Sequence, residues 1–469
     1  MRKQFIYKIV VFSLLFFLNS ISSYARNMNI LVQPFQNTGD AQLSWISADR
    51  THTDISNLKM VKTIEDVPFS WISTGMTDTI VVDLNNIRNI NVILDKDRKQ
   101  VLGELRFTHS RLVDETTIVK IGKLTGADII FTGSFLVSGN SIRVISKLIN
   151  VETGKVESST KLDGTLATIF DLQDKVLFSL MGEAEKIKIA DINPVKLTAK
   201  DKKTIEGKYR PKTEAYEWYS RGLQTIDKDP NLALDYFDRA VKIDQNYTDP
   251  LIQAGFVAGY TLNLFDEAHD YFKNANIIFK SRGDTSSFDY SNLMVNIGLV
   301  YFSKGEIDKA LRYYENSQAI RDRLSLQNTA HYSLLMTNIG AVHQYKGQFD
   351  SALKYFQHSQ VIHASLGLYN TEGYATIVMS MGNVYFNKGE IDKALRYYED
   401  SQAIKDRIGL QDTVGWGYLL YYRARVYEKQ GQRYAAGRYF RMAYDSFTRA
   451  DYSGHWRDLA LKNAERLGY

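Results

Sequence analysis

The stretch YFSKGEIDKALRYYENSQAI, residues 301–320, recurs as YFNKGEIDKALRYYEDSQAI at residues 385–404. The two copies lie 84 residues apart and differ only at Ser303/Asn387 and Asn316/Asp400. A diverged copy, YKGQFDSALKYFQHSQV at residues 345–361, lies midway, so the period is 42 residues. A fixed period of this size predicts stacked supersecondary units that act through an extended surface rather than through a catalytic cleft.

Each unit is predicted to contain two helices joined by a tight turn. Gly305 suits the left-handed conformation that ends a first helix, and Glu306 and Asp308 suit the start of the second. The turn glycines keep the period: Gly305, Gly347, Gly389 and Gly431. Small residues recur in two further columns, at Ala268, Ala310, Ala352, Ala394 and Ala436, and at Gly298, Gly340, Gly382 and Ala424. Large residues accompany them at Phe272, Tyr314, Phe356, Tyr398 and Phe440, which predicts close packing between paired helices.

These columns resemble the tetratricopeptide repeat (TPR), with Gly, Tyr, Ala, an aromatic and a second small residue at that family's characteristic positions. The resemblance is strongest in units beginning near Ser291, Ser333 and Ala375. Weaker units precede and follow them, so residues 213–450 are predicted to form about six repeats, and residues 451–469 a capping helix. The long period resembles the TPR regions of kinesin light chains and of bacterial peptide sensors.

The TPR resemblance implies that the first helix of each repeat lines a concave groove. Carrying over the family's groove positions gives a candidate partner-binding site at Asn292, Leu299, Phe302, Thr337, Gln344, Tyr345, Asn383, Phe386, Asn387, Tyr421 and Arg425. Amide side chains can hydrogen-bond the backbone of an extended peptide, and aromatic side chains supply apolar contact. The alternative is that the apolar members are ordinary core between repeats.

The region 26–182 has the mixed periodicity of an α+β domain. Strands are expected near residues 28–35, 91–94, 127–137, 141–150 and 155–162, with helices near 69–87, 114–124 and 170–182. The stretch ILVQPFQNTGD, residues 30–40, and the segments that follow it resemble, in order, the TolB amino-terminal and CsgG/FlgO-type envelope domains. That resemblance implies a non-catalytic docking role. The chain lacks the lipidated cysteine and the long membrane hairpins of CsgG, so channel formation is not carried over.

Residues 1–25 have the features of a secretory signal peptide. Arg2, Lys3 and Lys8 precede an apolar run at residues 9–18, and small residues favour cleavage after Ala25. The alternative is an uncleaved anchor. Removal of this segment lowers the formal charge from +5 to +2, which does not suggest nucleic-acid binding. The chain has no cysteine, so disulfides are excluded and an exported protein must rely on packing. The predicted location is the periplasm.

Residues 183–212 are predicted to be a basic linker. Its basic residues are Lys196, Lys200, Lys202, Lys203, Lys208, Arg210 and Lys212, and Pro194 and Pro211 interrupt helix formation. One interpretation is a solvated tether. The other is peripheral contact of the segment from Lys196 to Lys212 with anionic lipid or with an acidic partner.

The sequence offers no catalytic or metal-binding constellation. Phosphate-binding, zinc-protease and nucleophile-elbow motifs are missing, so we predict no catalytic residue, no metal and no cofactor. His343 is predicted to be packed in the core, whereas His358 and His363 are predicted to be surface positions. Asp78 and Asp83 are predicted to be solvated helix positions.

The sequence therefore predicts an α+β domain followed by an all-α TPR solenoid. The predicted function is an exported, non-catalytic scaffold whose TPR groove binds a protein or peptide and whose first domain docks to an envelope assembly. The alternative is a peptide-responsive sensor or regulator. Neither the partner nor the oligomeric state follows from the sequence.

Overall fold

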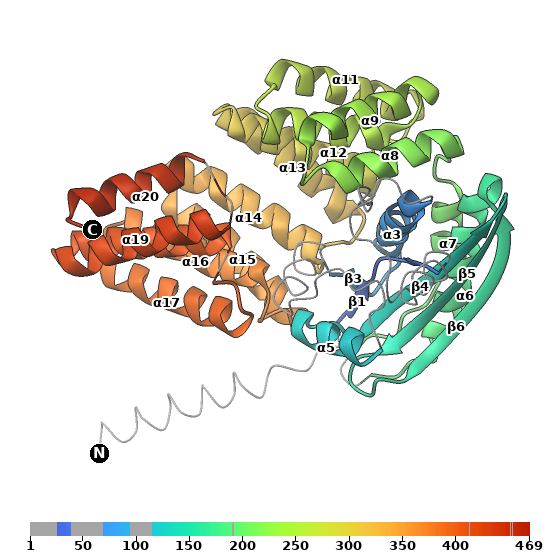
Figure 1. Ribbon diagram of the computed structural model, residues 1–469, viewed down its shortest axis with the longest axis horizontal. Helices are drawn as coiled ribbons and strands as arrows, with labels where there is room; N and C mark the ends of the chain where they lie inside the picture. Colours follow the sequence, from blue (N-terminus) through green and yellow to red (C-terminus); the bar gives the residue numbers. More distant parts are fainter. Residues whose placement is uncertain are drawn as a thin grey trace, which may run out of the picture.

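The computed structural model describes residues 26–38, 69–93, 115–189, 192–411, 413–450, 452 and 454–469. In these residues an N-terminal domain with a mixed sheet precedes a long solenoid of paired helices (Figure 1), which confirms the predicted fold class. The predicted signal peptide lies outside the described residues, as does residue 114, the predicted start of the second helix of the first domain.

The N-terminal domain is built on a single mixed sheet. Its strands are β1 (Met28–Val32), β2 (Gln36–Asn37), β3 (Ile90–Val92), β4 (Ile129–Ser138), β5 (Ser141–Asn150) and β6 (Val156–Thr165), in the order β3-β1-β4-β5-β6 with β2 pairing β4. β1 is parallel to both β3 and β4, whereas β4, β5 and β6 form the predicted antiparallel meander.

Both faces of this sheet carry apolar side chains. Ile30 and Phe131 face α3 (Ser70–Leu84) and α6 (Ile169–Ala184), while Leu31 and Ile130 face α5 (Glu115–Thr125). This alternation follows from the period of two along a strand, which directs successive side chains to opposite faces.

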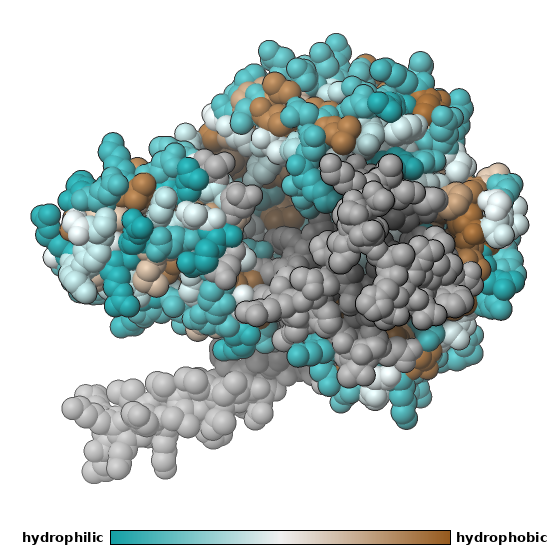
Figure 2. Space-filling view, in the orientation of Figure 1, coloured by the Kyte–Doolittle hydropathy of each residue, from teal (hydrophilic) through white to brown (hydrophobic). Residues whose placement is uncertain are grey.

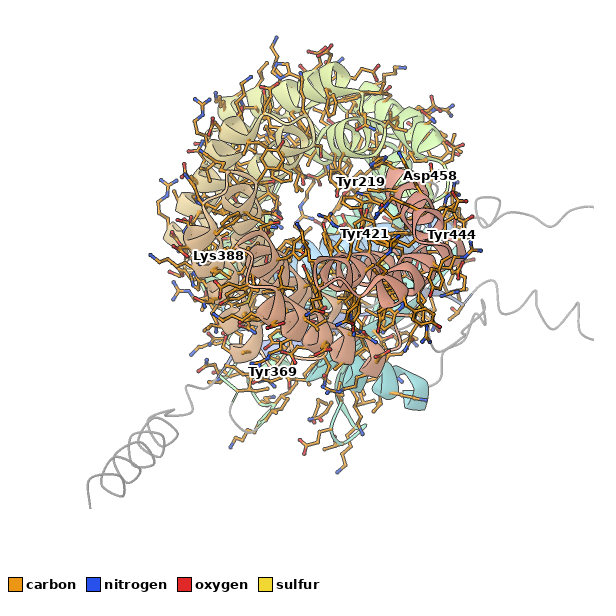
Figure 3. All side chains as sticks on the ribbon, turned by 90° about the vertical axis from the view of Figure 1, so that its left-hand side faces the viewer. Tyr219, Tyr369, Lys388, Tyr421, Tyr444 and Asp458 are labelled. Carbon is orange, nitrogen blue, oxygen red and sulfur yellow. The ribbon has the colours of Figure 1, made fainter. Side chains whose placement is uncertain are left out.

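The solenoid contains six helix pairs and a final helix in the described residues. The pairs are α8 (Thr213–Thr225) with α9 (Pro230–Ile243), α10 (Thr248–Phe256) with α11 (Phe265–Ser281), α12 (Phe288–Ser303) with α13 (Ile307–Arg323), α14 (Ala330–Tyr345) with α15 (Phe349–Ser365), α16 (Glu372–Asn387) with α17 (Ile391–Arg407), and α18 (Val414–Lys429) with α19 (Arg433–Arg449). The predicted capping helix is α20 (His455–Arg466). Figure 3 shows the pairs winding around a common axis.

The repeat period is visible in how the helices begin and end. Ser287, Thr329, Thr371 and Thr413 each accept a hydrogen bond from the backbone N–H three residues later and so cap a first helix. The predicted turn glycines, Gly305, Gly347, Gly389 and Gly431, all have positive φ.

The small-residue column allows the two helices of a pair to approach closely. A Cβ atom built on Gly298, Gly340 or Gly382 would lie 2.5, 2.7 or 2.7 Å from the ring of Tyr314, Phe356 or Tyr398, closer than real Cβ contacts. The rings therefore occupy the space that a side chain would need, as the alternation of small and large residues predicts.

The N-terminal domain and the first repeats share one hydrophobic core. The buried cluster around α3 and α6 continues through Tyr216 and Tyr219 of α8 to Phe237 of α9. The ring of Tyr216 lies 5.8 Å from that of Trp71 and 4.8 Å from that of Phe170. The domain is thus fused to the beginning of the solenoid rather than tethered to it.

A second contact joins the domain to the middle of the solenoid. The buried residues Asn29 and Asn91 hydrogen-bond each other, with Asn91 Nδ2 donating to Asn29 Oδ1 at 2.8 Å. The backbone N–H of Ala330, at the start of α14, donates to Asn91 Oδ1 (2.8 Å), and Asn29 Nδ2 donates to the carbonyl of Leu366 (2.5 Å). We call Asn29 and Asn91 the asparagine latch.

The basic segment is folded rather than a solvated tether, contrary to the first interpretation from sequence. Thr198 and Asp201 form a capping box at the start of α7 (Ala199–Glu206). Lys208 Nζ lies 2.9 Å from Asp83 Oδ1, and Arg210 pairs with Asp171 and Asp174 of α6. Lys196, Lys200, Lys202, Lys203 and Lys212 remain exposed.

Candidate ligand-binding site

The first helices of the repeats form the concave wall, and the residues predicted for the groove fall in two parts of it. Asn292 and Leu299 lie under the N-terminal domain, where they line a cavity. The others belong to α12, α14, α16 and α18 beyond that cavity. The wall is therefore covered at one end by the chain's own first domain and continues past it.

Two pairs of predicted residues meet across neighbouring first helices. The rings of Phe302 and Tyr345 are 6.1 Å apart and nearly perpendicular, and Tyr345 is 69% exposed. The guanidinium of Arg425 lies 5.3 Å from the centre of the Phe386 ring. Asn387 is exposed and Gln344 partly buried, and the side chain of neither hydrogen-bonds another described residue. These side chains form an amphipathic strip available to a partner.

Three of the predicted groove residues that lie beyond the cavity are engaged within the solenoid instead. Tyr421 is only 2% exposed because Trp456 of α20 packs against its ring, so its assignment to an accessible groove was wrong. Asn383 accepts a hydrogen bond from the hydroxyl of Tyr398 (2.7 Å) in the paired helix. Thr337 bonds to Ser359 of α15 (2.8 Å). Repeat position alone does not separate a side chain that faces the groove from one that faces the paired helix.

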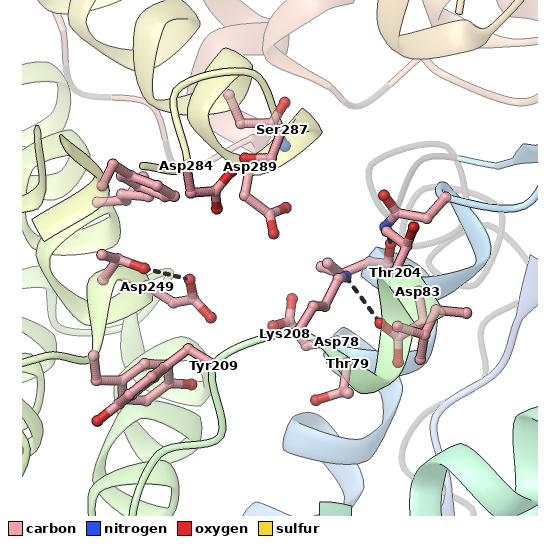
Figure 4. A pocket seen from close by; sticks show the side chains of 18 of the residues that line it. Asp78, Thr79, Asp83, Thr204, Lys208, Tyr209, Asp249, Asp284, Ser287 and Asp289 are labelled. Carbon is pink, nitrogen blue, oxygen red and sulfur yellow. Dashed lines mark hydrogen bonds and ion pairs between the residues drawn. The ribbon is translucent and has the colours of Figure 1, made fainter. Parts of the chain in front are cut away.

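A cavity of about 1110 Å³ lies between the N-terminal domain and the concave wall. One side is formed by α3, α7 and the segment that follows α7, and the other by α8, α10, α12 and the start of α14. Figure 4 shows Asp78 and Asp83 on the first side, facing Asp249, Asp284 and Asp289 on the other.

Asp78 and Asp83 are not the solvated positions that the sequence predicts. Asp83 is buried and forms the ion pair with Lys208. Asp78 Oδ2 accepts a hydrogen bond from the hydroxyl of Tyr219 at 3.0 Å. Asp78 therefore joins α3 to the solenoid, and Asp83 joins α3 to the segment that precedes the solenoid. Sequence reasoning missed them because their partners lie more than a hundred residues away.

The electrostatics of the cavity differ from those of an exposed surface. Burial raises the pKa of Asp249 to about 7, with the neighbouring carboxylates Asp289 and Asp78 adding to the effect and Lys208 and Arg282 opposing it. Burial, together with Arg321, lowers the pKa of His331 to about 3, so this histidine is neutral at physiological pH.

A column of basic residues is buried between repeats, one period apart. Arg321 donates to the carbonyl of His331 (2.6 Å) and to Asn292 Oδ1 (2.7 Å). His363 bonds through Nδ1 to Ser333 Oγ (2.6 Å), and Lys405 is fully buried near Glu372. The expectation that His363 is a surface position was wrong, whereas His358 is exposed as predicted.

His343 occupies the tyrosine column, but it is only partly buried. It stacks on Tyr355 at 5.2 Å, as Tyr301 stacks on Tyr313 and Tyr385 on Tyr397. Its place in the tyrosine column was predicted correctly, although the side chain lies at the edge of the core rather than inside it.

Two features are missing from the part of the chain that the structure describes. It has no group of three or more His, Cys, Asp or Glu side chains placed to hold a metal ion. None of its helices combines the length and the apolar character needed to cross a bilayer.

Figure 2 shows apolar side chains scattered over the face of α14–α20 rather than gathered there.

Comparison with known families confirms the repeats. The tetratricopeptide repeat model matches residues 289–359 and 326–407. These ranges cover the three units that the sequence singles out. A search of curated proteins gives no match.

Among solved structures, about half of the chain is similar to several proteins at TM-scores below 0.5. The Cut9–Hcn1 hetero-tetramer of the APC/C gives a TM-score of 0.42 at 16% identity, covering 55% of this chain and 43% of that one. A Rap protein complexed with competence and sporulation factor gives 0.40 at 14% identity, covering 57% and 78%. PilF of Pseudomonas aeruginosa gives 0.37 at 15% identity, covering 53% and 97%. The chain thus spans less than half the length of the Cut9–Hcn1 chain that it matches.

Proposed function

We propose that this protein is a non-catalytic scaffold whose TPR solenoid binds a protein or an extended peptide along its concave wall. The observation that carries the proposal is the strip of Phe302, Tyr345, Phe386 and Arg425, which successive first helices present beyond the N-terminal domain. Aromatic and arginine side chains are the types that dominate the binding energy of protein interfaces. Tyr345 in particular is too exposed to be explained by packing within the solenoid.

We further propose that the protein is exported, with cleavage after Ala25, and that its α+β domain docks to an envelope assembly. The signal-like residues 1–25 and the resemblance of residues 26–182 to TolB and CsgG-type domains support this part of the proposal. Cell fractionation of the full chain and of a variant lacking residues 1–25 tests it. Recovery of both proteins in the cytoplasm would contradict export.

Affinity capture with the full chain tests the binding role. A Tyr345→Ala/Arg425→Ala variant is expected to lose most of the partner captured by the wild type, about tenfold or more for two central interface residues. Tyr434→Ala is the matched control, because Tyr434 is 74% exposed but belongs to a second helix, α19. A partner retained equally by all three proteins would contradict use of the concave strip.

The second candidate function is a peptide-responsive sensor. The contacts that favour it are those that the asparagine latch makes with the start of α14 and with the turn after α15. Because the N-terminal domain holds both the first and the middle repeats, a ligand that changes the curvature of the solenoid would strain these contacts. Small-angle scattering with and without the captured partner distinguishes the two functions, since a passive scaffold keeps its curvature.

A further inference from the structure

Three carboxylates in the cavity lack a cationic partner. Asp249 of α10, Asp284 of the turn between α11 and α12, and Asp289 of α12 are partly buried and point into the same space (Figure 4). No described cation lies within ion-pair distance of any of them. Their one polar contact is a long hydrogen bond of 3.5 Å from Thr248 Oγ1 to Asp249 Oδ1. Like charges placed together in a partly buried site oppose folding unless something neutralises them.

The cations that line the deep part of the cavity are engaged elsewhere. Lys208 pairs with Asp83, and Arg210 pairs with Asp174. Arg282 donates to the carbonyl of Asn246 and lies 3.9 Å from the centre of the Tyr209 ring. Arg321 is directed to His331 and Asn292. The remaining lining cations, Lys200 and Lys203, are exposed on α7. The carboxylates of α10 and α12 therefore have no ion pair of their own. Lys208 and Arg282 act on Asp249 only at longer range, and Asp249 and Asp289 stand in the first turns of their helices, where the helix dipole favours negative charge.

A second observation at the same place is independent of these charges. Tyr247 lines the cavity and is only 4% exposed, yet its hydroxyl forms no hydrogen bond with any described residue. Its ring packs edge-on against Tyr219 at 5.3 Å. Because Tyr247 lines the cavity and its hydroxyl has no partner in the described part of the chain, that hydroxyl is available to hydrogen-bond a polar ligand there.

We propose that this cavity binds a lysine or arginine side chain of a basic peptide, with Asp249, Asp284 and Asp289 as its counter-ions and Tyr247 as an added hydrogen-bonding group. The proposal rests on the proposed function, because it names the chemistry of the peptide that the concave wall would bind. The cavity is large enough for more than one side chain, and an ammonium or guanidinium group is also attracted to the nearby tyrosine rings.

The protonation of Asp249 supports the same ligand. A carboxyl whose pKa is near 7 is partly protonated at neutral pH, and a bound cation would favour its ionised form. The charged groups that face it are Asp289, Asp78, Lys208 and Arg282. Binding is therefore expected to strengthen as the pH rises from 6 to 8.

Isothermal titration calorimetry on the full chain tests the proposal. The probes are a tetralysine peptide blocked at both ends, the corresponding tetraglutamate peptide, and spermidine. An Asp249→Asn/Asp289→Asn variant is expected to weaken tetralysine binding at least tenfold, since buried charge pairs contribute strongly to affinity. Asp266→Asn/Asp270→Asn is the matched control, because it removes two exposed charges outside the cavity and should change the affinity less than twofold.

The outcomes are distinct. Equal losses in both double variants, or no tetralysine binding by the wild type, would overturn the proposal. Spermidine that binds as tightly as tetralysine, with the same sensitivity to Asp249→Asn/Asp289→Asn, would assign the cavity to free polyamines instead of a peptide. A lower melting temperature of that variant would show that the carboxylates are structural, whereas an unchanged or higher one supports a ligand site. If the captured partner survives Asp249→Asn/Asp289→Asn but not Tyr345→Ala/Arg425→Ala, the scaffold function stands without this site.

Discussion

The two copies of the repeated stretch have nearly the same sequence but different surroundings. The first copy, α12 with α13, lies under the N-terminal domain and lines the cavity, whereas the second copy, α16 with α17, lies beyond it. Their second helices are almost identical, but their first helices have diverged. Asp289, Asn292 and Leu299 of the first copy correspond to Gly373, Thr376 and Asn383 of the second.

The second helix of each repeat is shared by the two copies, whereas the first helix is free to differ. The second helix contacts its own first helix through the same packing in both copies, shown by Gly298 against Tyr314 and Gly382 against Tyr398. The first helix faces the concave side, where the neighbours differ from repeat to repeat. Differences in function between the copies must therefore lie in their first helices.

The largest loss of stability should come from the asparagine latch, which contacts the start of α14, directly after the first copy. Asn91→Ala leaves the N–H of Ala330 and the carbonyl oxygen of the Asn29 amide without a partner, which should destabilise the protein by about 2–4 kcal/mol for two unpaired buried groups. Amide hydrogen exchange should rise at Ala330. The corresponding amide of Val414, after the second copy, serves as the internal control and should not change. Equal protection of Ala330 in wild type and variant would show that the latch contributes nothing there.

The loss of stability on replacing a packed glycine should be next in size, and it should be equal in the two copies. Gly298→Ala and Gly382→Ala each force a methyl group against a buried tyrosine ring, at an expected cost of about 1–3 kcal/mol for overpacking. Chemical denaturation measures both. Gly182→Ala in α6 is the control, because no atom lies within 4 Å of the added methyl group and the change should stabilise the helix. Clearly different losses at Gly298 and Gly382 would disprove equivalent packing.

A smaller change in stability should depend on pH, and it should arise only from Asp249 in the cavity. Asp249 has a raised pKa in the folded protein, so its protonated form stabilises the fold, and this stability is lost as the pH rises from about 4 towards 7. Asp249→Asn should remove that loss and raise the stability at pH 7.5 by on the order of 1–2 kcal/mol. Melting temperatures of wild type and variant between pH 5 and 8 measure the difference. Parallel curves for the two proteins would contradict the shift.

The smallest change in stability should come from the turn after each second helix. Ser325 has a φ of 59°, whereas the equivalent residues Gly367 and Gly409 have a φ of 72°. Ser325→Gly should stabilise the first copy by about 0.5–1 kcal/mol, and Gly409→Ser should destabilise the second by a similar amount. Thermal unfolding of the two single variants and of their combination would show whether the effects cancel, as independent sites require.

Much of the solenoid could be predicted because its determinants are local. Capping residues, turn glycines and the columns of small and large residues act within one repeat, and each of them recurs in the structure. The accessible residues of the candidate site could be predicted less well, because their exposure depends on contacts with other helices. Tyr421 and Asn383 occupy groove positions by repeat register, but α20 covers the first and Tyr398 binds the second.

The repeat, its turns and five of the six strands of the first domain could be predicted from the sequence, because periodicity and turn chemistry are properties of neighbouring residues; the short strand β2 was not predicted. Three relations emerge only from the folded chain: Asn29 and Asn91 join that domain to the middle of the solenoid, Lys208 pairs with Asp83, and Asp249, Asp284 and Asp289 share a cavity. These relations depend on the relative placement of segments far apart in the chain, and no local pattern specifies that placement.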